Sequence, residues 1–465
     1  MTGNLKHKLF ISIKTKFASA FQPNILLSFS KFLQKNTALG YPLFRKYLVL
    51  RLTLILALNM QTAIISYFVY KLTHDKLSLG LLGLWEVIPA IGCSFISGHF
   101  VDLNEKKGMA LKCVIGYLLL SAFFVLLSWP VFYQKAGVSL TVQLIYAGIF
   151  IGGALRAFIS PSMFALLGLL VPREEYPNAT TWSSTAWQAG AVFGPLFAGG
   201  MIAATGFNIS LFTVLIIELI SFIAIVAIPR QELHKKEKEP IVKSLKQGLR
   251  FVFKTQVVLA ALSLDMFAVL FGGAVALLPV YSEDILKVGE VGYGWMRAAP
   301  GIGSIITLFI LSNMPLKNKP GIKLLLAIAG FGITTIVFGV CGDIADTSFF
   351  GQFLGCKISW AFLLATFMLL AGGMFDAVSV VIRSTVLQIH TPAEMRGRVA
   401  AVNTMFISSS NELGAMESGI TAKWMGTVPA VVFGGCMTMV VVGVTYFAAP
   451  LLRRMKLDTK SETKN

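Results

Sequence analysis

Long apolar runs alternate with short polar intervals along most of this chain. Each run holds roughly 20 residues or more, the length that a helix needs to cross the hydrocarbon core of a bilayer. The pattern predicts twelve membrane-spanning helices, at 46–70, 78–100, 109–130, 141–165, 182–204, 206–229, 256–281, 291–313, 321–341, 358–385, 397–421 and 427–450. The expected fold class is an all-α integral membrane protein.

The polar intervals divide the chain into expected domains. The longest one, at 230–255, leaves six predicted helices on either side and is interpreted as a cytoplasmic linker. The predicted units are a basic N-terminal tail at 1–45, a helical bundle at 46–229, the linker, a second bundle at 256–450 and a cytoplasmic tail at 451–465. The first tail has the spacing of an amphipathic helix that lies on an anionic membrane face, and a partly disordered tail is the alternative.

The two predicted bundles are related as sequence repeats. A displacement of 211 residues brings Gly83 onto Gly294, and further along a displacement of 220 residues brings Gly194 onto Gly414. Two halves of six helices with the same orientation form a parallel repeat. Transporters built this way bind substrate between their halves near the bilayer midplane.

Composition supports a membrane protein. Only 13% of the 465 residues are charged and 55% are hydrophobic, whereas about 25% of the residues in a soluble domain are charged. The net charge of +18 could suggest nucleic acid, but the basic residues lie between the apolar runs, where they set membrane orientation. We therefore expect a multi-pass monomer in the inner (plasma) membrane, surrounded by lipid, with both termini cytoplasmic and no nucleic-acid partner.

Histidines and cysteines show no spacing typical of a metal or cofactor site. Most of the five cysteines lie inside apolar runs, and the five histidines lie outside the predicted membrane centre. The chain also lacks a GxxxxGK[ST] loop for ATP. These observations predict no metal, no cofactor and no enzymatic activity.

The predicted helix at 182–204 carries an unusual load of small residues. Ala186, Gly190, Gly194 and Ala198 recur at every fourth position and so share one helix face. Small residues allow a neighbouring helix to approach closely in lipid. Pro195 removes one backbone hydrogen bond and favours a kink. We expect this helix to move against a partner.

A polar segment after the second predicted helix resembles a known loop motif. It reads Gly98-His-Phe-Val-Asp102-Leu-Asn-Glu-Lys106-Lys107. The major facilitator superfamily has a cytoplasmic loop with the same order of Gly, three residues, Asp and basic residues. Leu103 stands where that family usually has Arg. The resemblance implies a transporter with twelve helices in two bundles.

The small-residue helix resembles a second motif of the same superfamily. Its pattern is Gly190-x-x-x-Gly194-Pro195, followed by Gly199 and Gly200, and similar fifth helices are associated with drug/proton antiporters. The stretches SPSMFALLGLLVPREEYPNA and TPAEMRGRVAAVNTMFISSSNELG are similar to the branch that includes enterobactin exporters and macrolide efflux pumps. These resemblances imply export.

Several ionisable residues fall inside the predicted helices, where their cost makes them functional candidates. They are Glu86, Arg156, Glu218, Asp265, Arg297, Asp376, Glu412 and Glu417. The repeat places Glu86 on Arg297 and Arg156 on Asp376, so equivalent positions carry opposite charges. One arrangement pairs Glu86 with Arg156 and Arg297 with Asp376. In the other, Arg156 faces Asp376 across a central cavity, as the superfamily's fourth and tenth helices imply.

Asp265 is interpreted as a lone carboxylate, because its repeat position is the apolar Leu54. Low dielectric suits such a group to carrying a proton, and a hydrated cap or hinge residue is the alternative. Glu412 and Glu417, in a polar helix, are equal candidates for proton coupling. Glu218 is the weakest, because nothing around it in its helix is polar.

The sequence also suggests which side chains face a substrate. Asn59 and Gln61 in the first helix, and Trp85 beside Glu86, are the expected cavity residues. The leading interpretation is a secondary active exporter of an amphipathic small molecule, siderophore or drug-like, driven by proton antiport. A nutrient importer or symporter and a lysolipid flippase are alternatives of the same fold, and a membrane enzyme is disfavoured.

Overall fold

The structure, a computed structural model, describes residues 37–230, 241–313, 319–342, 351–353, 356–392 and 395–455. The predicted tails at 1–45 and 451–465 and the predicted linker lie partly outside these ranges. The first half of the described chain contains η1 (Thr37–Gly40), α2 (Pro42–Thr73), α3 (Lys76–Leu103), α4 (Lys106–Leu127), α5 (Pro130–Ala136), α6 (Val138–Leu167), η2 (Arg173–Glu175) and α7 (Tyr176–Val226).

The predicted linker at 230–255 contains the amphipathic helix α8 (Ile241–Lys254). Then follow α9 (Gln256–Phe271), η3 (Ala274–Leu277), α10 (Leu278–Val280), η4 (Tyr281–Ile285), α11 (Gly289–Asn313), α12 (Pro320–Val340), β1 (Gly351–Phe353), β2 (Cys356–Ile358), α13 (Trp360–His390), α14 (Arg396–Met425), α15 (Thr427–Ala448) and α16 (Pro450–Arg454).

Ten of the described helical segments are long and apolar enough to cross a membrane. The 51-residue α7 lies within one of the ten, although its backbone leaves the helical region at Gly206, where φ is 79° and ψ is 178°. Glycine adopts this conformation at no steric cost, and the break coincides with the predicted boundary between 204 and 206. The polar α14 is not among the ten, so the number twelve stays a prediction.

The predicted helix at 256–281 is interrupted. α9 ends at Phe271, and the chain continues through Gly272, Gly273 and the short turns η3 and α10 to the π-helical turn η4. Two adjacent glycines are poor helix formers, and Pro279 in α10 cannot donate a backbone hydrogen bond. A Cβ atom at Gly273 would lie 2.7 Å from the Gly414 carbonyl oxygen, so α14 approaches the break closely.

A small antiparallel sheet departs from the all-α expectation. β1 pairs with β2, with Gly351 opposite Ile358. The predicted helix at 358–385 therefore begins later, at Trp360, where the Ser359 side chain accepts a hydrogen bond from the Phe362 amide at 3.2 Å. Ile358, the last residue of β2, is the only strand residue that the predicted helix included. The fold is nearly all-helical rather than purely so.

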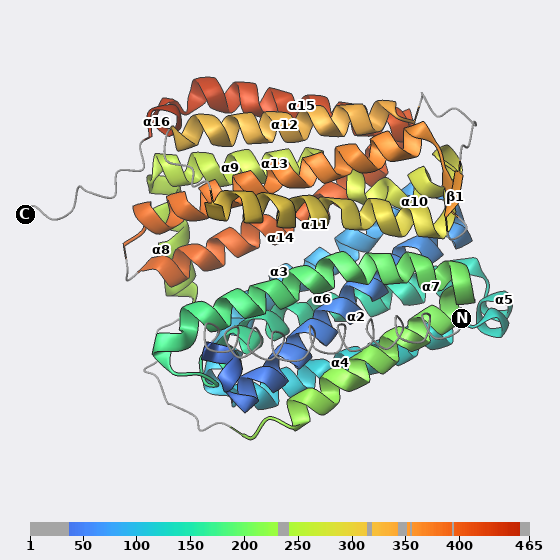
Figure 1. The fold of residues 1–465 in the computed structure, drawn as a ribbon, viewed down its shortest axis with the longest axis horizontal. Coiled ribbons are helices and arrows are strands. Elements are labelled where there is room, and N and C mark those ends of the chain that lie inside the picture. The colour runs from blue at the N-terminus through green and yellow to red at the C-terminus, as the bar shows by residue number, and fades with distance from the viewer. Residues whose placement is uncertain are drawn as a thin grey trace, which may run out of the picture.

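The helices of each half gather together. Figure 1 shows the blue-to-green helices of the first half in one group and the yellow-to-red helices of the second half in another. In the first group α2 packs on α7 and α3 on α6, and in the second α11 packs on α13 and α12 on α15. Two large contacts join the groups: α3 with α14 and α7 with α11.

The small residues predicted to form a packing seam on α7 serve two neighbours. A Cβ atom at Gly194 would lie 2.7 Å from Asn59 Cβ on α2, within the same half. A Cβ atom at Gly199 would instead lie 2.9 Å from Gly294 Cα on α11, in the other half. Gly200 has open space within 4 Å. The small residues therefore allow α7 to pack closely on α2 of its own half and on α11 of the other half.

Candidate functional site

A cavity of about 740 Å³ lies between the two halves. Its wall takes residues from α2, α3, α4, α6 and α7 in the first half and from α9, α11, α12, α13 and α14 in the second. On α2 the lining runs from Arg51 to Ser66, so it follows about four turns of that helix. The cavity extends along the helices rather than across one end of them.

The cavity wall carries four arginines and four carboxylates: Arg51, Arg156, Arg297, Arg383, Glu86, Asp265, Asp376 and Glu412. Their formal charges cancel. Six of the eight are predicted intramembrane candidates, and the other two, Arg51 and Arg383, were not predicted. Arg51 and Arg383 lie near the ends of their predicted helices, where an arginine reads as an interfacial residue that sets orientation.

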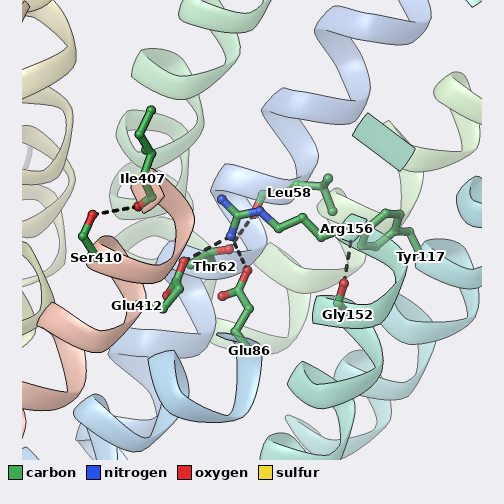
Figure 2. A network of polar contacts seen from close by, with 9 residues as sticks. All are labelled: Leu58, Thr62, Glu86, Tyr117, Gly152, Arg156, Ile407, Ser410 and Glu412. Atoms are coloured by element: carbon green, nitrogen blue, oxygen red, sulfur yellow. Dashed lines mark hydrogen bonds and ion pairs between the residues drawn. The ribbon is translucent and has the colours of Figure 1, made fainter. Parts of the chain in front are cut away.

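Arg156 on α6 binds two carboxylates from different helices. Its Nη1 atom donates to Glu86 Oε1 on α3 at 2.5 Å and to Glu412 Oε1 on α14 at 3.2 Å. Figure 2 shows the guanidinium between the two carboxyl groups, with Tyr117 of α4 beside the Arg156 stem. We call Arg156, Glu86 and Glu412 the charge triad. It joins the two halves of the chain at the cavity wall.

The charge triad settles part of the predicted pairing. Glu86 does pair with Arg156 within the first half. The contact of Arg156 with the second half goes to Glu412, however, and not to Asp376. The sequence repeat relates α6 to α13 and so suggested Asp376 as the partner of Arg156. The repeat does not show that α14, which carries Glu412, lies close to Arg156.

The predicted pair of Arg297 and Asp376 is absent. Among the described residues, no opposite charge lies within 4.0 Å of either side chain. Both side chains are half-buried and line the cavity.

The sequence suggested that Asp265 is a lone carboxylate, but in the structure it has an ion partner. It forms an ion pair with Arg383 of α13, and Ser379 Oγ donates to Asp265 Oδ1 at 3.4 Å. Asp265 and Arg383 are both buried, with 5% and 4% of their surface exposed. Ser379 and Arg383 lie four residues apart and so on one face of α13. That spacing indicates a polar face on α13, but it does not show which helix the face meets.

Of the other residues predicted to line the cavity or to carry a proton, some line the cavity and some do not. Asn59 and Gln61 line the cavity. Trp85 does not: it stacks with Tyr146, with ring centroids 6.4 Å apart, because neighbours in a helix point about 100° apart. Glu417 is also absent from the cavity lining, and its Oε1 accepts from Thr421 Oγ1 at 2.9 Å.

The predicted loop motif spans the break between α3 and α4. Gly98 and Asp102 lie in the last turns of α3, and Lys106 and Lys107 begin α4. Lys107 Nζ donates to the Val226 carbonyl oxygen at the end of α7 at 3.2 Å. No group of three or more potential metal ligands occurs in the part of the chain that the structure describes.

A second contact between the halves was not predicted. Tyr67 Oη on α2 donates to Glu283 Oε2 of η4 at 2.5 Å, Lys71 pairs with the same carboxylate, and Tyr70 donates to Asp284. We call these five residues the tyrosine latch. It lies just beyond Ser66, where the cavity lining on α2 ends. Both acidic residues lie in the π-helical turn η4, in the interrupted segment after α9. Hydropathy did not predict this interruption.

Comparison with known proteins identifies the fold's relatives. The sequence model of the Major Facilitator Superfamily matches residues 47–415. The MFS-type transporter YfiS of Bacillus subtilis (strain 168) is 24% identical over 410 residues, covering 86% of this chain and 91% of that protein. The enterobactin exporter EntS of Escherichia coli O1:K1 / APEC is 23% identical over 427 residues, covering 87% and 91%.

Solved structures show the same fold at low sequence identity. A POT family transporter in complex with 5-aminolevulinic acid aligns with a TM-score of 0.67 and 11% identity, covering 88% of this chain and 96% of that one. A bacterial homologue of the human lysosomal transporter Spinster, in an inward-facing and unoccupied conformation, aligns with a TM-score of 0.61 and 16% identity, covering 88% and 97%. The resemblance inferred from the sequence motifs is confirmed, and the chain belongs to the Major Facilitator Superfamily.

Proposed function

We propose that this protein exports an amphipathic small molecule, siderophore or drug-like, by alternating access and in exchange for protons. The superfamily is one of transporters, and the cavity between the halves is where transporters with parallel repeats bind substrate. A volume of about 740 Å³ falls within the range of roughly 300–1,000 Å³ for small-molecule sites. The similarity to enterobactin exporters supports a siderophore-like substrate.

The charge triad is the observation that carries the proposal. Arg156 contacts Glu86 and Glu412 only while α3 and α14 are held together. A proton on either carboxylate removes one attraction, and a charged substrate group can take its place. A ligand can shift a conformational equilibrium only if it binds one of the two conformations more tightly than the other. A proton or substrate that replaces a triad contact meets this condition, because it favours the conformation in which the triad is open. The triad is thus suited to couple cavity contents to the separation of the halves.

The tyrosine latch supports the same cycle from one end of the molecule. It holds α2 to η4 beyond the end of the cavity. In the proposed topology α7 counts as two helices and α14 also spans, which gives twelve helices with cytoplasmic termini. The latch then closes the external side. The bundles are 46–229 and 256–450, and the protein acts as a monomer in the inner membrane.

Transport in vesicles with an imposed pH gradient tests this function. Purified protein is reconstituted and supplied with a panel of catechol siderophores and macrolides, with protein-free vesicles as the control. The proposal predicts that substrate accumulates against its gradient in vesicles acidified inside and that added substrate drives proton flux outward. Substrate movement without proton flux would support a facilitator or flippase instead. Substrate moving in the same direction as protons would support a nutrient symporter.

A further inference from the structure

Glu218 is an acidic residue in the membrane interior that the charge triad does not use. It lies on α7 after the break at Gly206, and none of its surface is exposed. Neither carboxylate oxygen has a hydrogen-bond partner among the described residues. An isolated ionised carboxylate in such a place costs several kcal/mol even after relaxation. This environment therefore favours the neutral, protonated form of Glu218 over the ionised form.

A polar path leads from this carboxyl group to the cavity. The fully buried Ser121 on α4 faces Glu218 without hydrogen-bond geometry to it. Gln61 on α2 donates from Nε2 to Ser121 Oγ at 2.6 Å, and Gln61 lines the cavity. Because that bond occupies the Ser121 oxygen as an acceptor, the hydroxyl hydrogen remains free to turn toward Glu218. The sequence hides this arrangement, because its three residues lie on three different helices.

A second cavity residue, Tyr117, lies on the same face of α4 as Ser121. It precedes Ser121 by four residues, and Figure 2 shows it beside the Arg156 stem. No charged residue of the described chain forms an ion pair with Glu218.

We propose that Glu218 binds and releases the proton that is exchanged for substrate, an inference that rests on the proton coupling proposed above. On release, the O–H bond of the carboxyl group breaks and the proton passes to solvent in the cavity between Gln61 and Tyr117. The Ser121 hydroxyl then donates to the carboxylate left behind. The ionised carboxylate, fully buried and without an ion partner, disfavours this conformation. Protonation reverses each step, and no oxidant or reductant takes part.

The substitution Glu218→Gln tests the role while keeping the size of the side chain. Its matched control is Glu174→Gln, which alters an exposed carboxyl group outside the cavity. Infrared difference spectra recorded on addition of substrate should show a protonated-carboxyl stretch that bleaches in the wild type and in Glu174→Gln. Glu218→Gln should lack this band. Its pH-driven accumulation should fall to the level of protein-free vesicles, while substrate exchange without a gradient persists.

The possible results separate this inference from the proposed function. Full pH-driven accumulation in Glu218→Gln would overturn the role of Glu218 and leave antiport standing. Absence of proton flux in the wild type would instead overturn antiport itself.

If Glu218→Gln fails to fold, Ser121→Ala provides the second test. Removing the donor to the carboxylate favours the protonated form, so the pH of half-maximal transport should rise. An unchanged pH profile would overturn the inference.

Discussion

The two large helix contacts between the halves, α7–α11 and α3–α14, are built alike but differ in chemistry. In the α7–α11 contact a Cβ atom at Gly199 would lie 2.9 Å from Gly294 Cα, and in the α3–α14 contact a Cβ atom at Gly419 would lie 2.8 Å from Gly80 Cα. Gly199 and Gly419 are repeat equivalents, 220 residues apart. Both contacts therefore rely on close backbone approach between small residues.

One pair of equivalent positions distinguishes the two contacts. Val192, on α7, is buried and would meet a Cβ atom at Gly301 of α11 at 2.6 Å. Its equivalent 220 residues later is Glu412, which binds Arg156 at the cavity wall. At this pair of positions the first contact is apolar, whereas the second carries the charge triad. The difference indicates that at these positions the α3–α14 contact presents a titratable group and the α7–α11 contact does not.

The largest expected effect comes from placing an acid in the apolar contact. Val192→Glu introduces a carboxylate opposite Gly301, where the native valine is 4% exposed. An unpaired buried charge should cost several kcal/mol, so little folded protein should survive size-exclusion chromatography in detergent. Val192→Ala, which keeps the site apolar, is the control. A stable Val192→Glu protein would show that this contact tolerates charge as the other one does.

Overpacking the same contact should have the next largest effect. Gly199→Leu would force side-chain atoms into the backbone of α11, and overpacking typically costs about 1–3 kcal/mol. We expect a lower melting temperature and loss of transport. Gly200→Leu is the matched control, because a Cβ atom there meets nothing within 4 Å. Equal effects of the two substitutions would contradict close packing of the halves at Gly199.

Replacing Glu412 by valine, the residue at the equivalent position of the apolar contact, should remove the pH dependence of transport without unfolding the protein. Glu412→Val gives the α3–α14 contact the residue of its counterpart and leaves Arg156 paired with Glu86. Folding should persist, while transport should lose its dependence on the pH gradient. Melting temperature and pH-driven accumulation measured on one preparation check both statements. Wild-type accumulation in Glu412→Val would remove the triad from the mechanism.

The smallest effect is expected at the tyrosine latch. Lys71 and Glu283 keep 31% and 23% of their side-chain surface exposed, so their pair should contribute about 1 kcal/mol or less. Glu283→Gln should raise the rate at which a reagent from the external side labels Ser66→Cys in the cavity wall. The exposed Glu174→Gln serves as the control. An unchanged labelling rate would indicate that the latch does not close this end.

Hydropathy predicted much of the helical framework, including the break now seen at Gly206. It did not predict the end of α9 at Gly272, because glycines inside an apolar run hardly change its hydropathy. It also missed the partners of Asp265 and Arg156. Pairing depends on how each helix is rotated and on which helices meet, and neither follows from one helix alone. Glu412 could be chosen over Asp376 only once α14 was seen beside α3.

A charge exchange within the triad tests the central claim most directly. Arg156→Glu and Glu412→Arg should each abolish pH-driven transport, because each places like charges side by side in the cavity wall. The double variant restores one cation between two carboxylates and should recover transport. Arg156→Asp combined with Asp376→Arg should not recover it. Recovery in that second pair, with none in the first, would contradict the account.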